Sequence, residues 1–303
     1  MRRGPTRRRG TNRGFVGSGI SAPGSTASSP ARFAPGPREP GRASCPSGRA
    51  RGRLGPRLVA NPYAVGMASA SRHETSYRVR FDVRASGLLR YAQDIAWMHS
   101  EALGFDRAWY RERELAWLVR AAEVTVGSGI AMGAIAAVST QVVGYRKVWA
   151  RRRAEFHVDG DLAATVLTDW VLVDGRGRLT RLPDVFASRF PGTAVVDGLL
   201  RVALPPAPAG AARRSFAVRP HELDPMDHVN NAVYLDWLEE SILSAAPEGA
   251  ALLGAMPRVY RLEYAASAEP GSTIEAVTWR DGAGWAQRQS AAGTELLRAR
   301  LDG

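Results

Sequence analysis

The chain has 303 residues, 45% of them hydrophobic, which is enough for a sizeable core and for two domains. Of its 41 basic and 29 acidic residues, thirteen Arg and a single acid, Glu39, lie in residues 1–66, so the rest of the chain holds 28 of each and carries no net charge. Because the basic excess is confined to this N-terminal tail, composition argues against a nucleic-acid-binding body.

Residues 1–70 are rich in Arg, Gly, Pro and Ser and have no hydrophobic periodicity, which predicts disorder. Three interpretations of this tail stay open: a transit peptide, a nucleic-acid-binding arm, or translated sequence upstream of a true start at Met67. We favour the last, since one Lys against forty Arg is typical of a GC-rich genome. The only Cys, Cys45, lies in the tail, so the body has no thiol for a disulfide, a metal site or a nucleophile.

The first half of the body begins with a short alternating strand near Tyr77, followed by a polar connection, residues 82–87. Its next segment is predicted to be an amphipathic helix centred on Trp97, with one apolar stripe at helical spacing. The stripe consists of Leu88, Ala92, Ile95, His99 and Ala102. Four strands are predicted to follow, at 115–126, 134–145, 147–158 and 161–174, the last ending in a turn at 174–177.

Residues 124–145 carry no charge and contain Gly129 and Gly133 at a spacing found in membrane helices. Four glycines and several polar residues dilute this apolar stretch, and its second part alternates in strand fashion. We therefore predict the end of one strand, a glycine-containing loop and the start of the next strand.

The second half repeats the pattern. After a linker around 205–210, residues 216–243 read as a strand, a polar connection and a helix centred on Trp237. The helix places Ala232, Leu235, Leu238 and Ile242 on one stripe, with Asp236, Glu239 and Glu240 opposite. Four strands are predicted to follow, at 258–264, 273–280, 284–290 and 294–301.

A strand, a helix and four strands, occurring twice, predict an α+β protein of two tandem hotdog domains, each an antiparallel sheet wrapped around a central helix. The body resembles the acyl–acyl-carrier-protein (acyl-ACP) thioesterases, through DPMDHVNNAVYLDWLEES at 224–241, LLRYAQDIAWMHSEALG at 88–104 and VVGYRKVWARRR at 142–153. We expect an N-terminal hotdog domain at 71–192, a linker at 193–212 and a C-terminal domain at 213–303 that carries the active site.

Thioester hydrolysis needs a nucleophile or activated water and a group that stabilises the developing oxyanion. Unpaired N–H groups at a helix start, with a carboxylate just before the helix, can supply both. The resemblance implies Asp224 as the carboxylate, a backbone N–H near Asn231 as the oxyanion donor, and His228 as an orienting or proton-shuttling group. Asn230 or Asn231 would cap the helix, and Asp227 is a supporting candidate. Helix capping alone would explain about one of these polar residues.

Two positions depart from the pattern of the plant-type enzymes. Met226 stands where they have Asn, and Ser267 stands where they have a catalytic Glu, a short distance after Leu262-Glu263-Tyr264. Two alternatives to a thioesterase stay open: a hotdog dehydratase or hydratase, which also uses Asp and His near a helix, and a non-catalytic acyl-binding protein, which these two departures would fit.

The family resemblance implies acyl-ACP or acyl-CoA as the substrate, and we expect no cofactor, no metal, no nucleic acid and no membrane partner. A homodimer is left open. Arg151, Arg152 and Arg153 are either a docking site for an acidic carrier protein or, as we favour, a solvated strand face. The expected location is cytoplasmic, or plastid only if the tail is a transit peptide.

A chain that starts at Met67 should fold and keep its activity, because the tail cannot contribute a packed core. Circular dichroism, thermal unfolding and thioester hydrolysis of the shortened and full chains test this. Loss of folding on truncation would show that the tail packs on the body.

Overall fold

The computed structural model describes residues 72–190, 193–195 and 198–303. Residues 1–70, for which disorder was predicted, lie outside the described residues, so that expectation stays a prediction. In the described part, the first half contains β1 (His73–Arg78), α1 (Ala85–Ala102), α2 (Arg107–Glu112), β2 (Leu115–Val126), β3 (Ile135–Arg146), β4 (Trp149–Val158), β5 (Asp161–Asp174), α3 (Asp184–Arg189) and β6 (Ala194–Val195). The second half contains β7 (Ala212–Ala217), a 3-10 turn (Pro220–Glu222), α4 (Asn231–Ala245), α5 (Glu248–Gly254), β8 (Arg258–Tyr264), β9 (Thr273–Asp281), β10 (Gly284–Ala291) and β11 (Thr294–Asp302).

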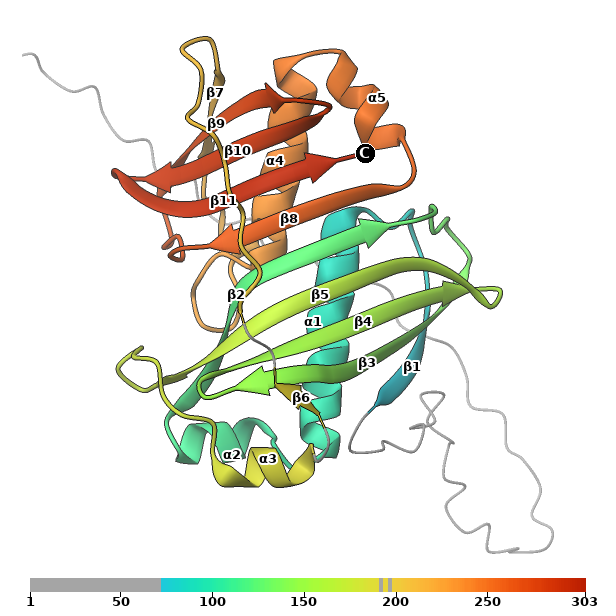
Figure 1. Cartoon of the computed structure of the whole chain (residues 1–303), viewed down its shortest axis with the longest axis vertical. Helices are drawn as coiled ribbons and strands as arrows, with labels where there is room; N and C mark the ends of the chain where they lie inside the picture. The colour runs from blue at the N-terminus through green and yellow to red at the C-terminus, as the bar shows by residue number, and fades with distance from the viewer. Residues whose placement is uncertain (1–71, 191–192, 196–197) are drawn as a thin grey trace, which may run out of the picture. The chain divides into compact units, whose positions relative to one another are not determined.

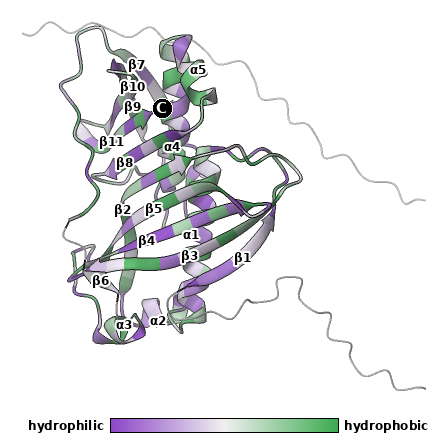
Figure 2. Cartoon of the chain, turned by 45° about the vertical axis from the view of Figure 1, so that its right-hand side comes forward, coloured by the Kyte–Doolittle hydropathy of each residue, from purple (hydrophilic) through white to green (hydrophobic). Residues whose placement is uncertain are grey.

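The strands of both halves form one 11-stranded sheet in the order β1-β3-β4-β5-β2-β8-β11-β10-β9-β7, with β6 added beside β3 (Figure 1). All pairs are antiparallel except β3–β6. The predicted strand–loop–strand at 124–145 is confirmed, because β2 ends at Val126 and β3 begins at Ile135. Hydrophobic and hydrophilic segments alternate along the strands (Figure 2), as expected for a sheet with one buried face.

The two long helices α1 and α4 pack on the same face of this sheet and against each other. Their predicted apolar stripes are buried, except Ala102, which is exposed, so that position was assigned wrongly. Trp237 is 1% exposed but Trp97 is 39% exposed, so only the second helix is centred on a core Trp. Side chains from both halves make one continuous core, which confirms the double hotdog fold.

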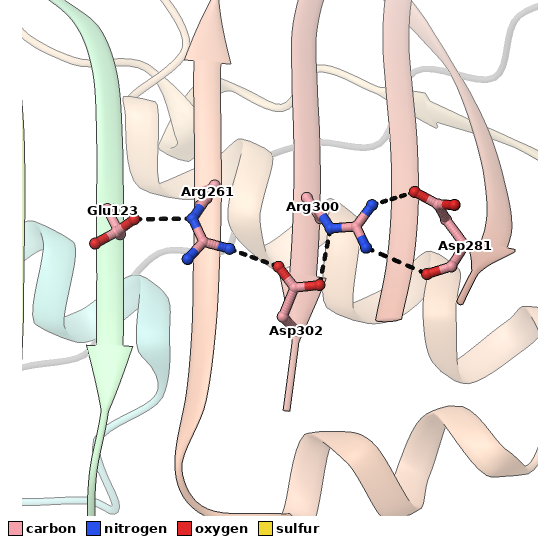
Figure 3. A network of polar contacts seen from close by, with 5 residues as sticks. All are labelled: Glu123, Arg261, Asp281, Arg300 and Asp302. Atoms are coloured by element: carbon pink, nitrogen blue, oxygen red, sulfur yellow. Dashed lines mark hydrogen bonds and ion pairs between the residues drawn. The ribbon is translucent and has the colours of Figure 1, made fainter. Parts of the chain in front are cut away.

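The halves join where β2 pairs with β8, from Ala121 opposite Glu263 to Val126 opposite Arg258. A chain of alternating charges crosses this seam on the sheet face away from the helices (Figure 3). It links Glu123 to Arg261 at 2.9 Å, Arg261 to Asp302 at 2.6 Å, Asp302 to Arg300 at 2.8 Å, and Arg300 to Asp281. Such partly exposed pairs add little stability individually, but opposite charges on neighbouring strands favour this register over slipped ones.

Two buried carboxylates on the same outer face bind the segment that connects the halves. Asp169 accepts two hydrogen bonds from the Arg151 guanidinium, at 2.6 and 2.8 Å, and one from Leu200 N–H at 2.6 Å. Glu263 accepts from Val202 N–H at 3.0 Å and from Arg201 at 2.5 Å. The connecting segment is therefore fixed across the sheet at 198–202 by charge-assisted hydrogen bonds.

Five short elements were not predicted: α2, α3, α5, β6 and the 3-10 turn at Pro220–Glu222. Helices α2 and α3 cover one end of the first half, where Phe105, Phe186 and Phe190 form a second apolar cluster. Helices of six or seven residues are too short to show a periodic pattern and are marginal alone, so α2 and α3 depend on packing in this cluster and α5 depends on packing against α4.

Replacing Glu263 by Gln should lower the free energy of unfolding by about 1.5–3 kcal/mol, because the hydrogen bonds from Val202 and Arg201 lose their charge assistance. Chemical denaturation measures the change. Glu155→Gln is the matched control, since Glu155 pairs on the same face with an exposed partner, Arg153, at 3.7 Å. Its effect should stay within about 0.5 kcal/mol; equal effects of both changes would contradict the fixing role of Glu263.

The same contribution should depend on pH. Burial alone would raise the pKa of Glu263, but the hydrogen bond from Val202 and the charge of Arg201 outweigh it and hold the pKa below its usual range. The stabilisation is then complete above the unfolded-state pKa, about 4.3, and is lost as the pH falls through the lower folded-state value. The difference in unfolding free energy between the parent and Glu263→Gln should shrink as the pH drops from about 5 to 3.

Candidate active site at the start of helix α4

The five predicted site residues lie in one loop and the first turn of α4. A bridge between Leu223 and Val229 closes the loop, and Asn230 N–H donates to Glu222 O at 2.9 Å. The loop is also attached to the segment after β8, because Val229 N–H donates to Ala268 O at 3.2 Å. These backbone hydrogen bonds fix the position of the loop's backbone, and therefore the positions from which its side chains project.

Asp224 organises the loop. Its N–H donates to His228 O at 2.7 Å, and its Oδ1 accepts from Met226 N–H at 2.8 Å and from His228 N–H at 3.2 Å. Its second carboxylate oxygen makes no hydrogen bond to the described residues. One oxygen thus holds the turn while the other is available, an arrangement in which the carboxylate is fixed before any substrate arrives.

Asp227 stands at the tip of the turn, with a left-handed φ of +59° and an exposed side chain. Asn and Asp tolerate this conformation better than most residues, so turn geometry accounts for Asp227 without a chemical role. His228 is partly buried, and its backbone N–H and C=O both bond to Asp224. Its imidazole makes no hydrogen bond to the described residues.

The helix start separates the roles of the two asparagines. Asn230 is the N-cap: its Oδ1 accepts from Ala232 N–H at 2.9 Å, and its C=O accepts from Val233 N–H at 2.9 Å. Among the described residues, the N–H of Asn231 has no acceptor. This N–H lies in the first turn, where the helix dipole also favours negative charge.

Two buried tyrosines hold this helix start. Tyr264 O–H donates to Asn231 O at 2.9 Å, and Tyr234 Oη accepts from Ala268 N–H at 2.8 Å. Burial, opposed by the Ala268 hydrogen bond and aided by the charge of Asp224, raises the pKa of Tyr234 to about 12. Burial also raises the pKa of Tyr264, so both side chains are neutral hydrogen-bonding groups at ordinary pH.

A chain of buried polar side chains reaches the same helix from β9 and β10. Gln289 Nε2 donates to Tyr234 O at 2.9 Å and to Gln287 Oε1 at 2.6 Å, and Gln287 Nε2 donates to Thr278 Oγ1 at 2.8 Å. Sequence reasoning missed this chain. Two glutamines at alternate positions of one predicted strand were the available signal, since both side chains then lie on the same face of the sheet.

The two departures from the family pattern lie at the surface. Met226 is 45% exposed and contributes only its backbone N–H to the loop. Ser267 is exposed, and its hydroxyl makes no hydrogen bond to the described residues. Neither side chain supplies a polar partner to Asp224 in this structure.

The first half has no comparable loop. Helix α1 starts at Ala85, and its N-cap residue, Arg84, makes no capping hydrogen bond through its side chain. Asp82, the only acid of the connection, accepts from Met132 N–H at 2.9 Å. The polar constellation therefore belongs to the second half alone.

The interpretation of Arg151, Arg152 and Arg153 as one solvated basic face was wrong for two of the three. Arg151 pairs with buried Asp169, and Arg152 turns toward the helices, where it contacts His99 at 2.9 Å. Arg153 alone is exposed on the outer face. Alternation of side chains along β4 separates them.

In the part of the chain that the structure describes, no helix has the length and apolar character needed to cross a membrane. Over the same residues, no group of His, Cys, Asp and Glu side chains is placed to hold a metal ion.

Two family models match the chain: the acyl-ACP thioesterase N-terminal domain over residues 73–189, and the acyl-ACP thioesterase C-terminal domain over residues 207–300. No curated protein sequence gives a match.

Three solved structures superpose on this chain over nearly the whole of their own length. A provisionally assigned oleoyl thioesterase from Lactobacillus plantarum is 18% identical and superposes with a TM-score of 0.65, covering 77% of this chain and 96% of its own. The 12:0-ACP thioesterase from Umbellularia californica is 19% identical, with a TM-score of 0.65 and coverage of 78% and 98%. An acyl-ACP thioesterase from Bacteroides thetaiotaomicron is 14% identical, with a TM-score of 0.61 and coverage of 76% and 96%. At these identities the likeness shows a shared fold.

The two asparagines should respond differently to truncation. Asn230→Ala removes the cap of α4 and should lower the free energy of unfolding by about 1 kcal/mol. Asn231→Ala is the control, because its side chain makes no hydrogen bond to the described residues and its backbone N–H is retained. Equal destabilisation of the two variants in chemical denaturation would contradict the capping assignment.

Proposed function

Because the chain belongs to the acyl-ACP thioesterase family, we propose that it hydrolyses the thioester of fatty acyl-ACP at the start of α4 and releases the free fatty acid. The observation that carries this placement is the N–H of Asn231, which has no acceptor among the described residues, next to a loop whose Asp224 has one carboxylate oxygen without a partner among them. No other helix start among the described residues combines an unpaired N–H with an Asp and a His in the preceding loop.

The proposed oxyanion donor is the Asn231 N–H. A thioester carbonyl oxygen placed there would gain negative charge in the transition state at the positive end of the α4 dipole. The hydrogen bond from Tyr264 O–H to Asn231 O helps to hold this donor in position, since it fixes the first peptide of the helix.

Asp224 is the proposed general base. It would take a proton from a water molecule as the water oxygen bonds to the carbonyl carbon, and the carbon–sulfur bond would break as the tetrahedral intermediate collapses. The leaving thiolate takes up a proton, for which His228 is the proposed donor or relay. Asp227 contributes turn geometry in this proposal, and Asn230 contributes the helix cap.

Met226 has no group that can transfer a proton, and the exposed Ser267 hydroxyl makes no hydrogen bond to the described residues, so His228 is the relay that we propose. Dehydration or hydration of an acyl chain needs an acid–base pair beside the β-carbon. The same site serves hydrolysis better, since a helix N–H stabilises an oxyanion on the thioester carbonyl. A non-catalytic acyl-binding protein would keep the fold but would not hydrolyse any thioester.

Asp224→Asn should lower kcat by about 10²–10⁴-fold, the usual cost of losing a positioned base. The substitution is suited to the test because Asn Oδ1 can still accept from Met226 and His228 N–H, so the loop should keep its shape and the unfolding midpoint should change little. Hydrolysis of acyl-ACP thioesters of several chain lengths, with the matching acyl-CoA thioesters in parallel, gives the readout and the carrier preference.

Asp227→Asn is the matched control, as it replaces an acid in the same turn and should retain most activity. His228→Ala should cost less than Asp224→Asn. If Asp224→Asn hydrolyses at the parent rate while Asp227→Asn is inactive, the active carboxylate is Asp227. If the parent hydrolyses no thioester in the panel, the acyl-binding alternative replaces the proposal.

A further inference from the structure

The first half holds a cluster of buried polar side chains that the proposed chemistry does not use. It lies between the sheet and the C-terminal half of α1 and consists of His73, Thr140, Arg152 and His99. His73 is 3% exposed, Thr140 is 1% exposed and His99 is 0% exposed, so these three groups are withdrawn from water, while Arg152 is partly buried.

Strand pairing brings three of these residues to one face. His73 of β1 lies opposite Thr140 of β3, which lies opposite Ala154 of β4, two residues from Arg152. Because Ala154 and Phe156 of β4 are buried in the core, Arg152, at the same alternation, faces the helices. The imidazole of His73 stacks on that of His99 from α1, with ring centroids 5.8 Å apart and planes at 18°.

Among the described residues, Arg152 has no anionic partner. Its guanidinium contacts His99 Nδ1 at 2.9 Å, and no carboxylate of the described residues forms an ion pair with it. Its neighbours differ, since Arg151 pairs with Asp169 and Arg153 with Glu155. Burial lowers the pKa of Arg152 to about 10, which still leaves it charged near neutral pH. Arg152 is partly buried, and a guanidinium that is partly withdrawn from water is stabilised by a charged partner.

Two neighbours of Arg152 are also unsatisfied. Both ring nitrogens of His73 and the hydroxyl of Thr140 have no hydrogen-bond partner among the described residues. Burial and the charge of Arg152 lower the pKa of His73, so it is a neutral ring with one N–H to donate. Unsatisfied polar atoms are rare in folded proteins, and several at one place point to an occupant.

From this arrangement we infer that the first half contains a carboxylate-binding site formed by Arg152, His73 and Thr140, with His99 orienting Arg152. The available groups are donors: the remaining N–H groups of a guanidinium, one imidazole N–H and one hydroxyl. A planar guanidinium pairs with a carboxylate through two parallel hydrogen bonds, which suits this anion better than a spherical one. The site does not depend on the role assigned to Asp224.

The ligand carboxylate has two sources, a small free carboxylate or the carboxylate that ends an aliphatic chain, and three probes distinguish them. Acetate, hexanoate and hexanol are titrated against the full chain while the unfolding temperature is followed, since a ligand that binds only the folded state raises it. A saturable rise with both acids identifies a small-carboxylate site, and a rise with hexanoate alone identifies a carboxylate with a chain. A rise with hexanol equal to that with hexanoate, or no rise with any probe, overturns the inference.

Substitutions then locate the binding. Arg152→Gln should raise the dissociation constant by at least about tenfold, as expected for the loss of a hydrogen bond between charged groups. Arg153→Gln is the matched control on the same strand and should leave it unchanged. Thr140→Val preserves shape and should weaken binding about two- to tenfold, which keeps the test decisive if Arg152→Gln does not fold. If both single variants fold and bind as the parent does, the site is contradicted. If Arg152→Gln does not fold, unchanged binding by Thr140→Val contradicts the site.

Discussion

The pairing of β2 with β8 is the interaction on which the rest of the molecule depends. It converts two sheets into one and places α1 and α4 on the same face, in contact. The core is therefore shared, and each helix buries its apolar stripe against the sheet and against the other helix. The ion pair between Arg90 and Asp236, at 2.9 Å, lies between the helices at this contact. Without the seam, neither helix would have its full set of neighbours.

The candidate site shows how much organisation a helix start requires. One carboxylate oxygen of Asp224 holds the turn, Asn230 caps the helix, and Tyr264 fixes the first peptide from the opposite side. These contacts leave one N–H and one carboxylate oxygen uncommitted. Preorganisation of this kind is what electrostatic stabilisation of an oxyanion needs, because donors already in position do not reorganise during the reaction.

Much of the fold could be predicted from periodicity. The bounds expected for 115–126, 161–174 and 258–264 are those of β2, β5 and β8, because long alternating strands flanked by turns are well marked in sequence. The short helices α2, α3 and α5 could not be predicted, since they form through contacts with distant residues. The pairing of β2 with β8 could not be read from periodicity, because no local pattern specifies which strands meet.

The candidate site could be predicted as a region but not in its details. Asp224 to Asn231 stood out as a polar cluster before an apolar helix. Which asparagine caps depends on the backbone angles at the helix start, where Asn230 N–H also donates to Glu222 O. Tyr234, Tyr264 and Gln289 act on the loop from positions that read as core. Arg152 could have been separated from Arg151 and Arg153 by strand alternation alone.

The charged contacts that fix residues 198–202 on the outer face also limit how this architecture can be divided. Asp169 belongs to the first half and Glu263 to the second, so the connecting segment is held by one acid from each. A half expressed alone would expose the edge of β2 or β8, strands rich in Val, Leu and Tyr, together with the unpaired face of its helix. Exposed edges of this kind pair with other chains and aggregate. Separating the two halves therefore carries a risk of aggregation, and insertions are better tolerated at the distal hairpin turns than between the halves.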